Sequence, residues 1–552
     1  MNNSLLALAV LTLAPGSSSA ASLSGVGWSA HGNQAGANLG ISVGAAGDVN
    51  GDGFADVILG AYLYDNGQNN EGRAFVYLGS AVGPQAAPAW TAENDEPLSS
   101  FGFSVGAAGD VNGDGYDDVI VGATRHDNPQ EDEGGAWVYL GSPAGLVATA
   151  AWTAESNLEY SRFGSSVGTA GDVNGDGYAD VIVGARFFGE AQSEKGKAYV
   201  YHGSPSGLST VPNWSVEGTQ NGQQFASSVL TAGDVNGDGY GDVVVGSSGT
   251  NAAFVFHGSA TGLSTAAAWT TQIGQAIAAF GSSVSTAGDV NGDGYDDVIV
   301  GALLFDNGQV DEGGAFLYHG SASGLVSTPA WTAEGDQAGA LFGNSVGTAG
   351  DVNGDGYSDV IVGAPLYDNV ESAEGRAFVY LGSPAGLTTG SDWTAESDQI
   401  AANLGRSVAG AGDVNRDGYA DVIVGASTFD HTQLDEGRVS VFFGTSLAPG
   451  RVQTLLASKS GADVELNWSP ACPAPDYAIY EGTIGSFTSH TWRYCSTGGA
   501  TSKTFAPASE SVYFLVVPLN GSAEGSYGTA GSGTERPVGS SACLPQQLGG
   551  CR

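Results

Sequence analysis

The chain has 552 residues, including 89 glycines, with 13% charged residues and a formal net charge of −42. Abundant glycine with few charges favours short strands joined by tight turns over long helices, and the length allows more than one domain. The acidic balance argues against nucleic acid and anionic membrane surfaces as partners, and leaves cations and basic or neutral ligands. A halophilic acidic surface is a competing explanation of this charge.

The chain starts with a short apolar run, residues 5–14, followed by small residues up to Ala20. This pattern is typical of a secretory signal peptide, residues 1–20, and the run is too short to span a bilayer. The basic residue usual near the start is missing, because Asn2 and Asn3 are neutral. No other stretch is apolar enough to cross a membrane. We therefore expect a secreted or cell-surface protein without a transmembrane segment in the mature chain.

A nine-residue stretch, 48–56, returns six more times along the chain. Each copy has side-chain oxygens at positions 1, 3, 5 and 9 and glycine at position 6, where the backbone must turn sharply. Such oxygens suit a hard cation, and up to seven structural Ca²⁺ ions are predicted. With position 7 included, the predicted metal ligands are Asp48, Asn50, Asp52, Phe54, Asp56, Asp110, Asn112, Asp114, Tyr116, Asp118, Asp172, Asn174, Asp176, Tyr178, Asp180, Asp234, Asn236, Asp238, Tyr240, Asp242, Asp289, Asn291, Asp293, Tyr295, Asp297, Asp351, Asn353, Asp355, Tyr357, Asp359, Asp413, Asn415, Asp417, Tyr419 and Asp421.

These copies differ from an EF-hand loop, which needs a glutamate at position 12 and a helix on each side. Position 12 is Leu59 in the first copy and valine in the other six, and a β-branched run follows the last aspartate. Such a run favours a buried strand, so we interpret the copies as calcium loops within β-hairpins. Any single copy could be a turn that binds no metal. The recurrence of the same four side-chain oxygens in seven copies favours cation binding. Arg416 replaces a loop glycine in the last copy, which we expect to bind most weakly.

Successive copies begin 62 residues apart, except for one interval of 55 after the fourth copy. A fixed period of this size indicates a solenoid or a propeller. Four strand-like segments recur in each period; in the second they are 101–107, 118–123, 136–140 and 150–154. Four antiparallel strands repeated seven times predict an all-β, seven-bladed β-propeller.

A tryptophan follows the third strand in every period but the last, and Trp28 near the N-terminus supplies the missing copy. We predict that the strand around Trp28 pairs with the final blade at 441–443 and closes the ring, which removes two exposed sheet edges. The other tryptophans of the series are Trp90, Trp152, Trp214, Trp269, Trp331 and Trp393.

The sequence Phe101-Gly102, the loop after it, and Gly122-Ala123 resemble the FG-GAP repeat of integrin α-chain heads and of bacterial secreted proteins. The resemblance covers roughly residues 28–446 and implies a calcium-binding propeller, residues 21–446, that acts in binding or adhesion. The transmembrane helix and cytoplasmic tail of integrins are missing, so receptor signalling is not implied. Departures from the repeat are Leu39, Ala226, Ser247 and Leu404, and Pro365 alone completes a Gly-Ala-Pro.

Turns between strands 1 and 2 and between strands 3 and 4 of a blade lie on one face, so the calcium loops should share a face with turns such as 141–146. The longer connections between strands 2 and 3, such as 125–134, 187–195 and 427–437, lie on the opposite face, where we predict the ligand-binding surface. In the fourth blade this connection shrinks to 247–251. The resulting notch either admits a ligand or is a neutral deletion.

Paired carboxylates in these connections invite comparison with glycosidases, but they recur in several blades, whereas an active site is singular. We predict a loop-stabilising or surface role for them. Histidines at the ends of third strands replace leucines of other repeats, and no Ser/His/Asp constellation is present, so we predict a protein that is not an enzyme. The carboxylate pairs are Asp65 with Glu71, Asp306 with Glu312 and Asp368 with Glu374. The strand-end histidines are His202, His257 and His319, and the isolated ones are His31, His126, His431 and His490.

After a linker at 446–450, short alternating strands at 464–468, 477–480 and 512–517 predict a small β-sandwich, residues 447–540, resembling a fibronectin type III module. A cysteine-bearing tail, 541–552, follows. Four cysteines in an exported chain predict two disulfides and allow three pairings. Proximity in sequence favours Cys472 with Cys495 and Cys543 with Cys551.

These expectations describe a monomeric, exported propeller, stabilised by calcium, that binds an extracellular protein or glycan. The alternatives are an extracellular hydrolase or lyase on a propeller scaffold, and a structural envelope protein.

Overall fold

The computed structural model describes residues 23–190, 193–445, 455–460, 463–468, 476–483, 490–507, 512–519 and 543–544. The chain divides into two compact units, one of which is Leu23–Gly444. The described regular elements are strands, with short 3₁₀ turns such as η2 (Ser248–Thr250). The prediction of an all-β protein is therefore confirmed.

The first unit contains seven four-stranded antiparallel sheets, each of which we call a blade and number in chain order. The first strands are β2 (Ser42–Gly47), β6 (Phe101–Gly109), β10 (Phe163–Gly171), β14 (Phe225–Gly233), β18 (Phe280–Gly288), β22 (Ser345–Gly350) and β26 (Leu404–Gly412). The second strands are β3 (Asp56–Ala61), β7 (Asp118–Ala123), β11 (Asp180–Ala185), β15 (Asp242–Ser247), β19 (Asp297–Ala302), β23 (Asp359–Ala364) and β27 (Asp421–Ala426).

The outer half of each blade consists of a third and a fourth strand. The third strands are β4 (Arg73–Tyr77), β8 (Gly135–Tyr139), β12 (Lys197–Tyr201), β16 (Ala252–Phe256), β20 (Gly314–Tyr318), β24 (Arg376–Tyr380) and β28 (Arg438–Gly444). The fourth strands are β5 (Trp90–Ala92), β9 (Trp152–Glu155), β13 (Trp214–Glu217), β17 (Trp269–Gln272), β21 (Trp331–Glu334), β25 (Trp393–Glu396) and, in the seventh blade, β1 (Leu23–His31).

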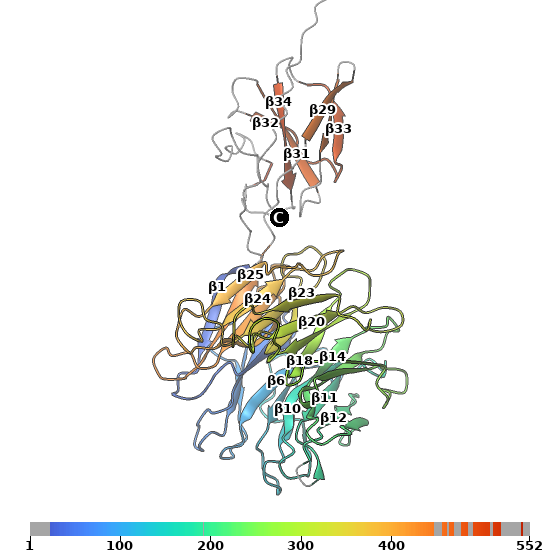
Figure 1. The fold of residues 1–552 in the computed structure, drawn as a ribbon. Coiled ribbons are helices and arrows are strands. Elements are labelled where there is room, and N and C mark those ends of the chain that lie inside the picture. Colours follow the sequence, from blue (N-terminus) through green and yellow to red (C-terminus); the bar gives the residue numbers. More distant parts are fainter. Residues whose placement is uncertain are drawn as a thin grey trace, which may run out of the picture. The chain divides into compact units, whose positions relative to one another are not determined.

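The blades pack side by side through their first strands, and β6, β10, β14 and β18 lie next to one another in Figure 1. The second strands are buried along their whole length, since each blade is covered by a neighbour on both faces. Serine hydroxyls of the first strands accept a hydrogen bond from a valine N–H in the next blade, as Ser42 does from Val105 at 3.1 Å. The series ends with Val43, which donates to Ser407 at 3.1 Å, so the seventh blade lies against the first.

The strand β1 closes this ring, as predicted. It pairs antiparallel with β28, with Trp28 opposite Val441. The Trp28 indole N–H donates to the Gln85 carbonyl of the first blade at 3.1 Å, and its ring contacts Tyr77 edge-on at 4.9 Å. Trp152 makes the same two contacts with the third blade, to Ser209 and Tyr201. Trp28 therefore fills the place of the missing fourth-strand tryptophan.

The described part of the second unit forms two three-stranded sheets with a shared core, as expected for a small sandwich. Trp468 and Ile479, which belong to different sheets, are both buried in that core. Its resemblance to fibronectin type III stays a prediction. The strands are β29 (Leu455–Ser460), β30 (Asp463–Trp468), β31 (Asp476–Thr483), β32 (His490–Tyr494), β33 (Ser502–Phe505) and β34 (Val512–Leu519).

The predicted cysteine pairing is wrong, because Cys495 forms a disulfide with Cys543 across a Cα separation of 5.4 Å. Cys495 directly follows β32, and the Cys543 N–H donates to the hydroxyl of Tyr480 in the adjacent β31. Sheet pairing, not distance along the chain, brings these two sulfurs together. Cys472 and Cys551 lie outside the described residues, as does the predicted signal peptide.

Candidate functional site

The repeated loops fold around their own short polar side chains. In the first loop, Asp48 accepts hydrogen bonds from the N–H groups of Asp52 and Gly53 at 3.0 and 2.8 Å. The Asn50 side-chain oxygen also accepts from the Asp52 N–H at 3.0 Å, and Asp52 accepts from the Phe54 N–H at 3.0 Å. Gly53 has a φ of +85°, which only glycine adopts without strain. Positions 1, 3 and 5 are thereby drawn into one compact turn.

The other six loops repeat these contacts. In the second loop, Asp110 accepts from Asp114 and Gly115, and Asp114 accepts from Tyr116. The bond lengths are 3.1, 2.8 and 3.1 Å, close to those of the first loop. The same contacts are present in the seventh loop, where Asp413 accepts from Asp417 and Gly418. The loop conformation is therefore a property of the repeat.

The aspartate at position 9 has a different environment from the other acids. Asp118 is fully buried, and its two carboxylate oxygens accept from the N–H groups of Val111 and Gly141 at 3.0 and 2.8 Å. It therefore ties the loop to the turn between strands 3 and 4, which places both on one face as predicted. Burial raises the pKa of this carboxyl to about 7, although the two hydrogen bonds oppose the shift. The same pKa is found for Asp56, Asp180, Asp242, Asp297 and Asp421.

The donor set of each loop fits a hard divalent cation. Asp110, Asn112 and Asp114 offer side-chain oxygens that are at least partly exposed, and Tyr116 offers its main-chain carbonyl. Cations such as Ca²⁺ prefer oxygen ligands of this kind, six to eight of them, including water. Asp118 lies in the buried layer and would join such a site only while keeping its main-chain contacts. Calcium in these loops stays a prediction.

Neighbouring loops interlock through the ring at position 7. A side chain at Gly51 would collide with the Tyr116 ring of the next loop, since its Cβ would lie 2.7 Å from a ring carbon. The seventh loop departs from this pattern because Arg416 replaces the glycine and keeps a φ of +56°. Its guanidinium lies 5.9 Å from the centre of the Phe54 ring and donates to the Asp52 carbonyl at 3.3 Å. Sequence reasoning noticed Arg416 but missed this contact across the closure of the ring.

The strand-end histidines lie beside these loops. His202 directly follows β12, and its Nδ1 is 3.2 Å from the side-chain nitrogen of Asn174 in the third loop. Burial lowers the pKa of His202, so the neutral imidazole is favoured. Burial lowers the pKa of His257 and His319 in the same way.

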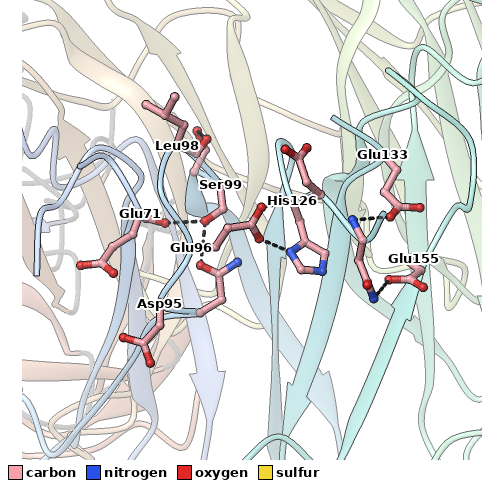
Figure 2. Close-up of polar contacts among 12 residues, drawn as sticks. Glu71, Asp95, Glu96, Leu98, Ser99, His126, Glu133 and Glu155 are labelled. Atoms are coloured by element: carbon pink, nitrogen blue, oxygen red, sulfur yellow. Dashed lines mark hydrogen bonds and ion pairs between the residues drawn. The ribbon is translucent and has the colours of Figure 1, made fainter. Parts of the chain in front are cut away.

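On the opposite rim, acidic side chains hold the connections between strands 2 and 3. Glu133 is fully buried and accepts from the Asn128 N–H at 2.6 Å, while the Asn128 side chain donates to Glu155 at 2.9 Å (Figure 2). Figure 2 also shows His126 paired with Glu96, which belongs to the preceding blade.

The paired carboxylates noted in the sequence take the loop-stabilising role. Asp306 accepts from the Asp311 N–H at 2.6 Å, and Glu312 accepts from the Asn307 N–H at 2.6 Å. Glu71 and Glu374, like Glu312, are almost completely buried. Carboxylates occupied in this way hold the loop.

One group of three carboxylates on this rim has oxygens within 4.8 Å of one another: Glu374, Glu396 and Asp398. Arg376 forms an ion pair with Glu396, so part of the negative charge is already compensated.

In the fourth blade the connection is reduced to η2, and a cavity of ≈ 290 Å³ lies beside it, where the notch was predicted. No helix among the described residues is long and apolar enough to cross a bilayer.

Comparison with protein families matches the FG-GAP repeat at residues 39–77, 101–139, 163–201, 342–380 and 404–442, and an FG-GAP-like repeat at 234–300. Integrin alpha-5 of Xenopus laevis is 34% identical over 173 residues, which is 30% of this chain and 16% of that protein. Integrin alpha-PS2 of Drosophila melanogaster is 32% identical over 237 residues, which is 40% of this chain and 16% of that protein. The WD40 domain of Toxoplasma gondii coronin superimposes with a TM-score of 0.42 at 12% identity, covering 77% of this chain and 89% of that chain. The chain thus spans about a sixth of the length of these integrins.

Proposed function

We propose that this chain, which carries FG-GAP repeats and is similar to integrin α chains over part of its length, is an extracellular, adhesion-type binding module whose propeller is stabilised by calcium. It is secreted or held at the cell surface, acts as a monomer, and binds a protein or glycan through the rim opposite the calcium loops. The observation that carries the proposal is the oxygen-only ligand set, present with one loop conformation in seven blades. Stabilisation on one face leaves the other face free for recognition.

Calcium would be held by Asp110, Asn112, Asp114 and the main-chain carbonyl of Tyr116 in the second loop, and by the equivalent residues elsewhere. When bound, it neutralises carboxylates that otherwise repel one another. The protein residues orient these oxygens through the main-chain N–H contacts, and Asp118 anchors the turn from behind.

Binding, and not catalysis, is supported by the paired carboxylates of the rim, since these accept hydrogen bonds from main-chain N–H groups. Longer connections such as 125–134 and 427–437 supply different side chains in each blade on this rim. We therefore place the ligand-binding surface there.

The test is an array of glycans and extracellular matrix proteins, probed with the full chain in calcium and in chelator. We expect retention on a restricted set of ligands in calcium, and loss of retention in chelator. Equal retention in both buffers would argue against calcium dependence, and no retention on any ligand would favour a structural envelope role.

A further inference from the structure

The notch of the fourth blade opens into a pocket of ≈ 290 Å³ between the third and fourth blades. Its walls come from β13, β16 and β17 and from the segment that leads into β14. This volume is close to the lower limit for small-molecule sites, which bury a ligand among apolar groups with a few fixed polar ones. The pocket therefore has room for one ring of a larger ligand.

The floor of the pocket is aromatic because the shortened connection between strands 2 and 3 of the fourth blade has no aromatic side chain to cover it. In five other blades a ring from this connection covers the aromatic side chain in the middle of the third strand. In the fourth blade Phe254 has no such cover and lines the pocket, with Phe225 behind it at 5.4 Å. The covered pairs are Tyr64 with Phe75, His126 with Trp137, Phe188 with Tyr199, Phe305 with Phe316 and Tyr367 with Phe378.

Gln223 places one oriented donor in the wall of this pocket. Its side chain is buried, with the residue 6% exposed, and its oxygen accepts from the N–H groups of Thr219 and Gln220 at 2.7 and 3.1 Å. These two contacts fix which end of the amide is the oxygen. The Nε2 group donates to no acceptor among the described residues, and it keeps some accessible surface in the lining of the pocket, where it can donate to a ligand.

Gln223 is itself a departure from the repeat. The equivalent position, two residues before the first-strand Phe or Leu, is alanine or serine in the other six copies. The substitution therefore occurs in the one blade whose connection is shortened, and both changes meet in one pocket. The equivalent residues are Ala37, Ser99, Ser161, Ala278, Ala340 and Ala402.

The remaining lining points to a neutral ligand rich in hydroxyl groups. Gln220, Gln272 and Thr250 offer amide and hydroxyl groups, and the one charged side chain in the lining, Glu217, pairs with Lys195 at 3.1 Å. An anion would find no free cation in this lining. An apolar peptide side chain would cover the Gln223 donor without offering it an acceptor, which costs the donor its hydrogen bonds to water.

We propose that this pocket binds one pyranose ring of a neutral glycan. The C–H face of the ring stacks on Phe254, and a ring hydroxyl accepts the hydrogen bond from Gln223 Nε2. The proposal rests on the proposed binding function, to which it adds the ligand class and a subsite at the edge of the ligand-binding rim.

Saturation-transfer NMR on the full chain in calcium buffer, with the methyl glycosides of glucose, galactose and mannose as probes, tests this assignment. We expect at least one probe to bind with a dissociation constant on the order of 1 to 10 mM, and saturation to be strongest on one face of its ring. Gln223→Glu keeps the two N–H contacts but replaces the donor by an acceptor, and it should weaken binding about tenfold. Gln85→Glu makes the same change at an exposed glutamine of the first blade, outside the pocket, and as the matched control it should bind as wild type.

A second variant keeps the test decisive if Gln223→Glu lowers the melting temperature. Phe254→Leu preserves an apolar floor but removes the aromatic face, and it should abolish the ring-face saturation pattern. Failure of every probe to bind the wild type, or equal binding by wild type and both variants, would overturn the proposal. If the wild-type protein binds none of the methyl glycosides but is still retained on the array, the assignment of this pocket is wrong and the proposed binding function stands. If it binds a methyl glycoside but is not retained on the array, the proposed binding function is wrong and the assignment of the pocket stands.

Discussion

At the scale of single residues, the acids of one loop have separate roles. Asp114 is exposed and available to a cation, whereas Asp118 is fully buried and holds two main-chain N–H groups. The sequence motif alone predicts Asp114 and Asp118 as equivalent ligands, because a nine-residue motif does not show which side chain is buried. The structure distinguishes the acid that builds the loop from the acids that face the solvent.

Replacing these two acids should therefore separate folding from metal binding. Asp118→Ala leaves the Val111 and Gly141 N–H groups buried without acceptors, and should lower the free energy of unfolding by about 3 kcal/mol even in chelator. Asp114→Ala should cost less than about 1 kcal/mol in chelator but abolish calcium binding by the second loop. Urea unfolding in calcium and in EDTA measures both effects. Equal losses for the two variants in EDTA would contradict the division of roles.

Arg416 is the residue whose backbone is strained. A side chain at a φ of +56° costs about 1 to 2 kcal/mol, while an exposed cation–π contact such as that with Phe54 returns about 0.5 to 1 kcal/mol. Arg416→Gly should therefore stabilise the propeller by up to about 1.5 kcal/mol and raise the calcium affinity of the seventh loop. Thermal melting and calorimetric titration test this. A lower melting temperature would show that the contact with Phe54 outweighs the strain.

At the scale of elements, a cation bound in one of the repeated loops would be coupled to a proton. Burial raises the pKa of Asp118 from 3.8 to about 7, so the metal-free protein loses stability as the pH rises through this range. A cation held by Asp118 would favour the ionised carboxylate, and we therefore expect its binding near pH 6 to release a proton.

In a loop whose position 9 carboxyl has a pKa of about 7, such as the second, calcium affinity should accordingly rise about tenfold between pH 6 and pH 8, because the proton competes with the cation at the lower pH. Titration calorimetry in two buffers of different ionisation enthalpy measures both the affinity and the protons released. An affinity that does not change with pH, without proton release, would show that the position 9 carboxyl takes no part.

The regular elements could be predicted from the sequence because the period of 62 residues repeats their pattern. The closure by Trp28 followed from a count of tryptophans. Contacts between different copies of the repeat could not be predicted from the sequence, because the residues involved are far apart in the chain. Examples are the contact of Arg416 with Phe54 and the position of Gln223 beside the notch. The Cys495–Cys543 disulfide was missed for the same reason, because proximity in sequence says nothing of which strands pair.

At the scale of the whole molecule, many weak sites add up to substantial stabilisation. With about 1 mM free calcium and dissociation constants of roughly 10⁻⁴ to 10⁻³ M, each predicted site would contribute about 0.4 to 1.4 kcal/mol. Occupation of all loops would contribute about 3 to 10 kcal/mol, comparable to the stability of a whole domain. Exhaustive chelation should therefore lower the melting temperature of the propeller strongly, and excess calcium should restore it. Differential scanning calorimetry is the measurement, and an unchanged transition would refute structural calcium.

The closure of the ring depends on a contact between the two ends of the first unit, where the Phe443 N–H donates to Ser24 across 419 residues. The strand β1 is synthesised first but can pair only when β28 has been synthesised. It must therefore stay unpaired while the rest of the propeller is made and folds. Contacts this distant in sequence make folding slow, and the open β28 edge is exposed to other chains in the meantime. Export of the chain before it folds would bring β1 and β28 of one chain into the same compartment together. This would favour pairing of the two strands within one molecule over pairing between molecules.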